Sequence, residues 1–103
     1  KFNIWSNILK SEGYNTSHIH PAGWLSGGVY LKIPSNIKKN EAGIEFSLHG
    51  DNYPIKIKNI PTITIVPKVC DLVLFPSSLF HKTIPFKSSD ERMMIAFDIH
   101  KLQ

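Results

Sequence analysis

The strongest constraint on the fold is a series of short runs, from residue 25 onward, that are rich in β-branched and aromatic residues. Glycine, proline, asparagine and serine separate these runs, and the period of an amphipathic helix is absent between them. The expected strands are Leu25 to Ile33, Ile44 to Leu48, Ile55 to Ile57, Thr62 to Val66, Asp71 to Phe75, His81 to Pro85 and Arg92 to Ile99. Strands at roughly ten-residue spacing without intervening helices predict an all-β antiparallel sandwich or barrel of the jelly-roll type.

The N-terminal segment follows a different pattern. Apolar residues recur there at spacings of three and four, at Phe2, Trp5, Ile8 and Leu9. This spacing predicts a short amphipathic helix over residues 2–10. The last run, Arg92 to Ile99, is apolar on both faces. We therefore expect one face of that strand to lie in the sandwich interior and the helix to cover the other.

Composition narrows the class of protein. The 103 residues have the length of one domain, here residues 1–103. Hydrophobic residues make up 42% and charged residues 19%, which excludes a disordered chain, and no apolar run is long enough to span a membrane. The net charge of +4 comes from scattered lysines, which does not favour nucleic-acid binding. A single cysteine, Cys70, and a start unlike a signal peptide favour a reducing, cytoplasmic setting.

Histidines and one arginine are the candidate functional residues. The tripeptide His18-Ile19-His20 lets both imidazoles approach one metal ion if it is extended, because residues two apart project from the same face. By itself it also fits two surface or capping histidines. A third histidine, His81, follows a buried strand, and Arg92, the only arginine, opens the final strand. Arginine pairs with carboxylates through a planar fork, so a metal and an anionic co-substrate can share one mouth of the sandwich.

The order of these motifs resembles the 2-oxoglutarate and Fe(II)-dependent oxygenases, and most closely their branch of small members, over nearly the whole chain. The stretch Asn15 to Pro21 reads N-x-x-H-x-H-P, and Ser26 to Tyr30 reads S-G-x-x-Y. Residues 71–77 read D-L-x-x-F-P-S ahead of a distal histidine, and an arginine precedes a hydrophobic strand. The resemblance implies a double-stranded β-helix, a jelly-roll or cupin-like fold, that holds iron in a cup at one end.

For the metal, the resemblance implies that His18 and His81 are the two histidine ligands of Fe(II). His20 occupies the position of the usual carboxylate ligand, which is a departure from the family pattern. The sequence has no acidic residue between Glu12 and Glu41 to replace that carboxylate. Either three histidines hold the iron, or two do and His20 lies outside the ligand shell.

For the co-substrate, Arg92 matches the family residue that binds the distal carboxylate of 2-oxoglutarate, and Tyr30 matches a tyrosine that donates to the same group. Ser26 shares the strand face of Tyr30 and is expected to line the pocket. Met94 stands where many relatives have a serine that binds the same carboxylate. The implied activity couples decarboxylation of 2-oxoglutarate to hydroxylation of a C–H bond in a further substrate, which the sequence does not identify.

Two other functions fit parts of the pattern. A cupin-type three-histidine metalloprotein also combines H-x-H with a distal histidine. A cupin normally carries a glutamate where this chain has Trp24 and Leu25, however, and it gives Arg92 no task. The other alternative is a non-catalytic jelly-roll binding module, since a fold alone does not confer a function. An exposed edge strand would also let two copies pair as a homodimer.

Overall fold

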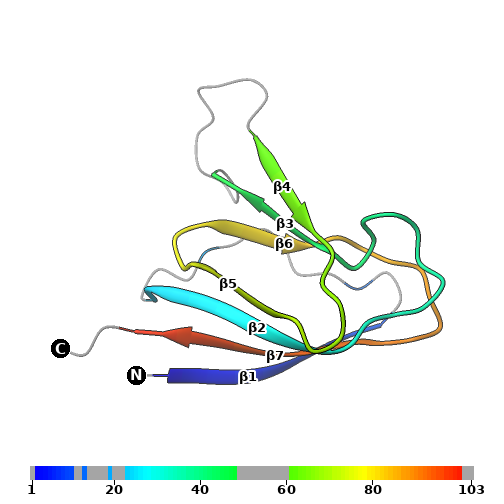
Figure 1. Cartoon of the computed structure of the whole chain (residues 1–103), viewed down its shortest axis with the longest axis horizontal. Coiled ribbons are helices and arrows are strands. Elements are labelled where there is room, and N and C mark those ends of the chain that lie inside the picture. The colour runs from blue at the N-terminus through cyan, green and yellow to red at the C-terminus, as the bar shows by residue number, and fades with distance from the viewer. Residues whose placement is uncertain (1, 11–12, 14–18, 20–22, 49–60, 101–103) are drawn as a thin grey trace.

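Strands account for all the regular structure that is seen. The computed structural model describes residues 2–10, 13, 19, 23–48 and 61–100. The strands in these ranges are β1 (Phe2–Leu9), β2 (Leu25–Lys32), β3 (Ile44–Ser47), β4 (Thr62–Ile65), β5 (Leu72–Pro76), β6 (Phe80–Thr83) and β7 (Arg92–Ile99). They form two antiparallel sheets, in the orders β1-β7-β2-β5 and β4-β3-β6 (Figure 1). No helix in the described ranges is long and apolar enough to cross a membrane.

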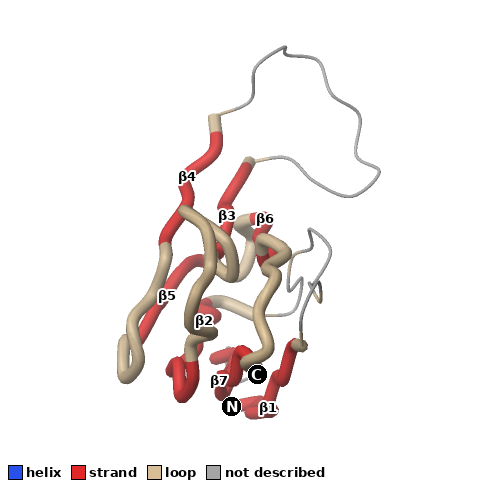
Figure 2. The backbone as a smooth tube through the Cα atoms, turned by 90° about the vertical axis from the view of Figure 1, so that its right-hand side faces the viewer, coloured by secondary structure: helices blue, strands red, loops and turns tan. Residues whose placement is uncertain are grey.

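The two sheets lie one above the other, and their inner faces enclose a small core. Figure 2 shows β4, β3 and β6 above a curved layer formed by β5, β2, β7 and β1. Tyr30 of β2 and Ile44 and Phe46 of β3 form the centre of the core and are almost completely buried. The ring of Phe46 lies 5.0 Å from that of Phe75 on β5, so side chains of both sheets meet in the interior.

The all-β, jelly-roll type of fold predicted from the sequence is confirmed. Strands β2 to β7 coincide with expected runs, with small shifts at their ends. Proline marks several of these ends, since Pro76 closes β5 and Pro85 follows β6, where a missing N–H does little harm. The expected strand Ile55 to Ile57 lies outside the described residues.

The short helix predicted over residues 2–10 is wrong, because this segment forms strand β1. β1 pairs with β7 along its whole length, from Phe2 opposite Ile99 to Leu9 opposite Arg92. Its apolar spacing suits a helix, but asparagine and serine between those residues are weak helix formers, and a helix this short is marginal without packing. Backbone hydrogen bonds to β7 stabilise a strand here rather than a helix.

The outer face of the four-stranded sheet is apolar and exposed among the described residues, because the expected helix does not cover it. Its exposed side chains come from three strands and include Phe2, Ile4, Ile8, Leu72, Leu74 and Ile95. The inner face of the same sheet carries buried polar and charged side chains as well as apolar ones. The polar and charged side chains that could bind a ligand therefore lie on the inner face.

Candidate active site

Alternate residues of β7 face the space between the two sheets, because successive side chains of a strand point to opposite faces. The inward residues of β7 that line the pocket there are Arg92, Met94, Ala96 and Asp98. Residues of β1, β2, β3, β5 and β6 complete the lining. The last strand, which the sequence shows as mostly apolar, thus places a cation near its start and an anion near its end in one pocket.

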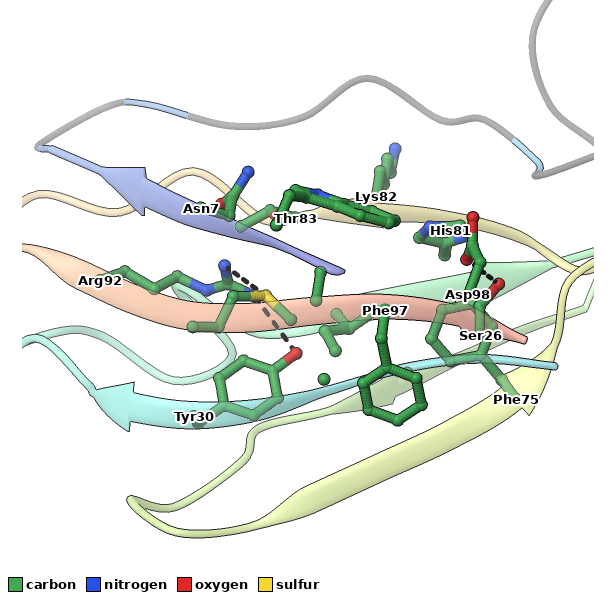
Figure 3. A pocket seen from close by; sticks show the side chains of 16 residues that line it. Asn7, Ser26, Tyr30, Phe75, His81, Lys82, Thr83, Arg92, Phe97 and Asp98 are labelled. Atoms are coloured by element: carbon green, nitrogen blue, oxygen red, sulfur yellow. Dashed lines mark hydrogen bonds between the residues drawn. The ribbon is translucent and has the colours of Figure 1, made fainter. Parts of the chain in front are cut away.

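The pocket has two chemically different ends (Figure 3). Arg92 and Tyr30 lie at one, which we call the guanidinium end. His81, Asp98 and Ser26 lie at the other, which we call the carboxylate end.

At the guanidinium end, Arg92 is 1% exposed and is held by neutral groups. Its Nε donates to the carbonyl oxygen of Ala42 at 3.0 Å, and Nη2 donates to the hydroxyl of Tyr30 at 3.4 Å. Nη1 contacts Sδ of Met94 at 3.5 Å. The guanidinium carbon lies 5.1 Å from the centre of the Tyr30 ring, within cation–π range. These contacts fix the direction of the guanidinium, and none of these partners in the described part of the chain is an anion.

A strained turn before β3 positions the carbonyl that receives Arg92. Ala42 has a φ of 61°, a left-handed conformation that costs a residue with a Cβ roughly 1 kcal/mol. Its N–H donates to the carbonyl of Ile84 at 3.0 Å, which ties the turn to the chain after β6. Ala42 is buried, so its carbonyl satisfies one donor of Arg92 where water has little access.

Burial acts against the charge of Arg92. Desolvation lowers the pKa of its guanidinium, and the contact with Tyr30 partly opposes this effect. Burial also raises the pKa of Tyr30, so its hydroxyl keeps its proton at neutral pH and can donate. Within the described residues, the contacts of Arg92 include no carboxylate. A buried cation without an anion is costly, and a carboxylate entering the pocket would relieve that cost.

A second polar group near Arg92 also lacks a partner. The Oδ1 atom of Asn7 is buried and accepts no hydrogen bond from the residues that the structure describes. Asn7 lies on β1 opposite Met94 of β7 and lines the pocket at the guanidinium end (Figure 3). Rotation of the amide would turn its NH₂ group toward a bound carboxylate. Sequence analysis missed Asn7 because it assigned this segment to a helix.

At the carboxylate end, two serines hold an aspartate. The hydroxyl of Ser26 donates to Oδ1 of Asp98 at 2.7 Å, and the Oγ atoms of Ser26 and Ser77 are also 2.7 Å apart. Ser26 has a single proton, so with an ionised Asp98 it is Ser77 that donates to Ser26. Ser26 lies opposite Asp98 in the pairing of β2 with β7, although 72 residues separate them in the sequence. No sequence motif signalled this arrangement.

The imidazole of His81 has a defined orientation. Its Nδ1 lies 3.1 Å from the carbonyl oxygen of Leu79, and because a carbonyl only accepts, Nδ1 carries the proton. In the neutral ring the lone pair then belongs to Nε2. The ring is 4.6 Å from that of Phe75, which lines the same pocket. A neutral imidazole with a fixed tautomer is suited to binding a metal.

The structure brings Arg92, Tyr30, Ser26 and His81 into the same pocket. The other two predicted metal ligands, His18 and His20, lie outside the described residues. In the part of the chain that the structure describes, no group of three or more histidine, cysteine, aspartate or glutamate side chains is suited to a metal. The donors that are present, one imidazole and one buried carboxylate, are of the kinds that bind Fe(II) in proteins.

Comparisons with known proteins give the chain its family. Residues 3–98 match the model of a family described as "Putative 2OG-Fe(II) oxygenase". Among solved structures, a prolyl-4-hydroxylase of Pseudomonas putida is similar, with a TM-score of 0.70 at 14% identity over 99% of this chain. The match covers 52% of that protein, so the chain spans about half its length, and at this identity it shows the fold alone. No curated protein matches the chain. Because the family match extends over nearly the whole sequence, the chain belongs to this family of 2OG-Fe(II) oxygenases.

Proposed function

We propose that this chain forms the active site of an Fe(II)- and 2-oxoglutarate-dependent dioxygenase that hydroxylates a C–H bond of a further substrate. Family membership supports the proposal. The observation that carries it is the buried cation of Arg92, which contacts only neutral groups among the described residues, in a pocket whose opposite end holds His81. A pocket with a cation at one end and metal-binding groups at the other suits a molecule that is a carboxylate at one end and a chelator at the other.

In this proposal the guanidinium end binds the distal carboxylate of 2-oxoglutarate. Arg92 supplies charge and donors in a planar fork, and the neutral hydroxyl of Tyr30 donates alongside it. Asn7 offers an amide within the same end. The lining also includes the apolar residues Ile44 and Ala96, which suit the methylene groups of the co-substrate.

The carboxylate end receives the metal, which His81 binds through Nε2. His18 and His20 are the further ligands that the family resemblance implies. Fe(II), when bound there, supplies the activation of dioxygen and the oxidative decarboxylation of 2-oxoglutarate. The protein contributes orientation, because Arg92 and His81 at opposite ends allow the co-substrate to enter in one direction only.

The test is anaerobic addition of Fe(II) and 2-oxoglutarate, with the visible charge-transfer band of the chelate as the readout. We expect the band in the wild-type protein and its loss in Arg92→Ala at the same co-substrate concentration. Lys68→Ala is the matched control, because it removes an exposed lysine on the loop before β5 and should leave the band unchanged.

Three results would contradict the proposal. A protein that binds iron but shows no band at any concentration of 2-oxoglutarate would be a cupin-like metalloprotein. A protein that binds neither iron nor 2-oxoglutarate would be a non-catalytic jelly roll. A band of equal strength in wild type and Arg92→Ala would show that 2-oxoglutarate does not bind at the guanidinium end.

A further inference from the structure

Met94 lies beside Arg92 at the guanidinium end of the pocket. On the inner face of β7, it stands opposite Tyr30 of β2 and opposite Asn7 of β1. Its side chain is half-buried and lines the pocket. Its Sδ atom lies 3.5 Å from Nη1 of Arg92, the contact that a dashed line marks in Figure 3. An oxidisable sulfur atom is therefore in contact with the buried cation.

The space for this methionine comes from a missing side chain on the neighbouring strand. A Cβ on Gly28 of β2 would lie 2.0 Å from Cε of Met94, so the methyl end of the methionine fills the place that a side chain would take. Met94 also packs against the core cluster around Tyr30. These contacts hold the thioether beside the guanidinium, although a methionine side chain has enough rotatable bonds to adjust its position.

The thioether is the weakest acceptor that the guanidinium contacts among the described residues. The carbonyl oxygen of Ala42 lies 3.0 Å from Nε, and the hydroxyl oxygen of Tyr30 lies 3.4 Å from Nη2. A thioether sulfur accepts hydrogen bonds only weakly, so an entering anion can displace it from Arg92 at little cost. Hydrogen bonds from an ionised donor to oxygen are much stronger. An oxygen atom attached to this sulfur would therefore hold the guanidinium far more firmly than the sulfur does.

We propose that Met94 is a site of reversible oxidation, and that its sulfoxide oxygen binds Arg92 in place of the co-substrate carboxylate. In the reaction, the sulfur lone pair attacks the hydroxyl oxygen of a hydroperoxide, the O–O bond breaks and an S–O bond forms. The hydroxyl proton passes to the leaving oxygen, which departs as water or an alcohol. Sulfur is oxidised by two electrons and the peroxide is reduced by two. Methionine sulfoxide reductases reverse the change.

The sulfoxide competes effectively because it belongs to the same chain as the cation. A tethered group binds at a high effective concentration, whereas a carboxylate from solution binds at its actual concentration. Met93, the other methionine of the sequence, points to the opposite face of β7, so its oxidation brings no oxygen to Arg92. The expected loss of 2-oxoglutarate binding rests on the proposed function, but the contact between sulfoxide and guanidinium needs no ligand.

The first test observes this contact directly. Arg92 is the only arginine of the chain, so protein labelled with ¹⁵N-arginine gives the NMR signals of one guanidinium. The tests use a Cys70→Ser background, because the exposed thiol would also react with peroxide. After treatment with hydrogen peroxide, we expect the Nη proton signals to shift and their exchange with water to slow at least threefold. The same change is expected when Met93→Leu is added to the background, and no change when Met94→Leu is added.

The second test measures 2-oxoglutarate affinity through the charge-transfer band of the anaerobic Fe(II) complex, after the peroxide has been removed. Each protein is compared with itself before oxidation. We expect affinity to fall at least tenfold in the background protein and with Met93→Leu, and less than twofold with Met94→Leu, whose leucine nearly conserves the side-chain volume. Methionine sulfoxide reductases A and B with dithiothreitol should restore the affinity.

Three results would overturn the inference. The first is an unchanged guanidinium spectrum in protein whose Met94 is fully oxidised by mass spectrometry. The second is oxidation of Met93 while Met94 stays reduced, and the third is an equal loss of affinity with Met94→Leu. The first two need no variant at position 94. A protein without the band before oxidation would contradict the proposed function, and the guanidinium spectrum would still decide whether the sulfoxide binds Arg92.

Discussion

The guanidinium end of the pocket is organised around one buried cation, whereas the carboxylate end is organised around one buried anion. Arg92 is held by a backbone carbonyl, a phenol and a thioether, all neutral. Asp98 is held by a chain of serine hydroxyls. In both cases neutral groups fix the orientation of a buried side chain.

The difference between the two ends of the pocket indicates how this small protein can orient a ligand. Because β7 is an extended strand, it holds Arg92 and Asp98 apart and prevents them from pairing with each other. The guanidinium of Arg92 is then available to an anionic ligand. We expect an anionic group at Arg92 and a metal ion at the end of the pocket that holds His81.

The largest expected effect separates the ends by affinity. Arg92→Lys keeps the positive charge but loses the planar fork, and a lysine cannot bond the Ala42 carbonyl and a bidentate carboxylate together. We expect 2-oxoglutarate affinity for the Mn(II)-loaded protein to fall about 100-fold, or about 2.7 kcal/mol, in calorimetric titration. Mn(II) affinity should change less than threefold. A parallel loss of both affinities would show that the two ends are not independent.

Two neighbouring glycines of β2 give the next largest effect. A Cβ on Gly27 would collide with the backbone carbonyl of Val73, which cannot move without breaking the sheet, whereas a Cβ on Gly28 would meet the flexible end of Met94. We expect Gly27→Ala to lower the free energy of unfolding by about 2–3 kcal/mol, and Gly28→Ala by about 1 kcal/mol or less.

Denaturant titration of both alanine variants checks this difference. Because Met94 also contacts Arg92, Gly28→Ala should in addition weaken 2-oxoglutarate binding a few-fold. Equal destabilisation by the two variants would contradict the packing described for the two faces of β2.

A substitution at Asn7 shows whether this residue lowers the stability of the ligand-free protein while it strengthens 2-oxoglutarate binding. Its buried Oδ1 has no hydrogen-bond partner within the described residues, so Asn7→Leu should stabilise the ligand-free protein by about 1 kcal/mol. The same change should weaken 2-oxoglutarate binding several-fold, since the amide no longer reaches the carboxylate. A destabilised variant with unaltered binding would show that Asn7 serves the fold alone.

Tyr30→Phe gives the smallest effect, because the hydrogen bond it removes is long, at 3.4 Å. We expect a three- to tenfold loss of 2-oxoglutarate affinity. Burial raises the pKa of Tyr30 above its ordinary value of 10.0, so the unfolded chain releases this proton first. The stability that protonated Tyr30 contributes is complete below pH 10 and is lost as the pH rises toward the folded pKa. The stability difference between wild type and Tyr30→Phe should therefore decline only above pH 10, and a decline at lower pH would contradict the assignment.

Sequence patterns predict the strands from β2 onward because their apolar runs are bounded by proline and glycine, which report local geometry. The apolar positions of β1 fit a helix as well as a strand, and its partner β7, almost the whole chain away, decides between them. Local pattern carries no information about that partner.

Sequence patterns likewise identify some residues of the candidate site and miss others. Arg92, Tyr30 and His81 stand in short motifs on or next to regular strands, so the sequence singles them out. Asp98 becomes notable only when the pairing of β2 with β7 brings Ser26 beside it, and that register cannot be read from either segment alone. The roles of these residues stay predictions until ligands are bound.

The most direct test of the whole account is a crystal structure of the protein with Mn(II) and 2-oxoglutarate bound under anaerobic conditions. We predict the metal within bonding distance of His81, and the distal carboxylate of the co-substrate on Arg92 and Tyr30. A co-substrate carboxylate placed away from Arg92, or a metal bound outside the end of the pocket that holds His81, would contradict the separation of charges on which the account depends.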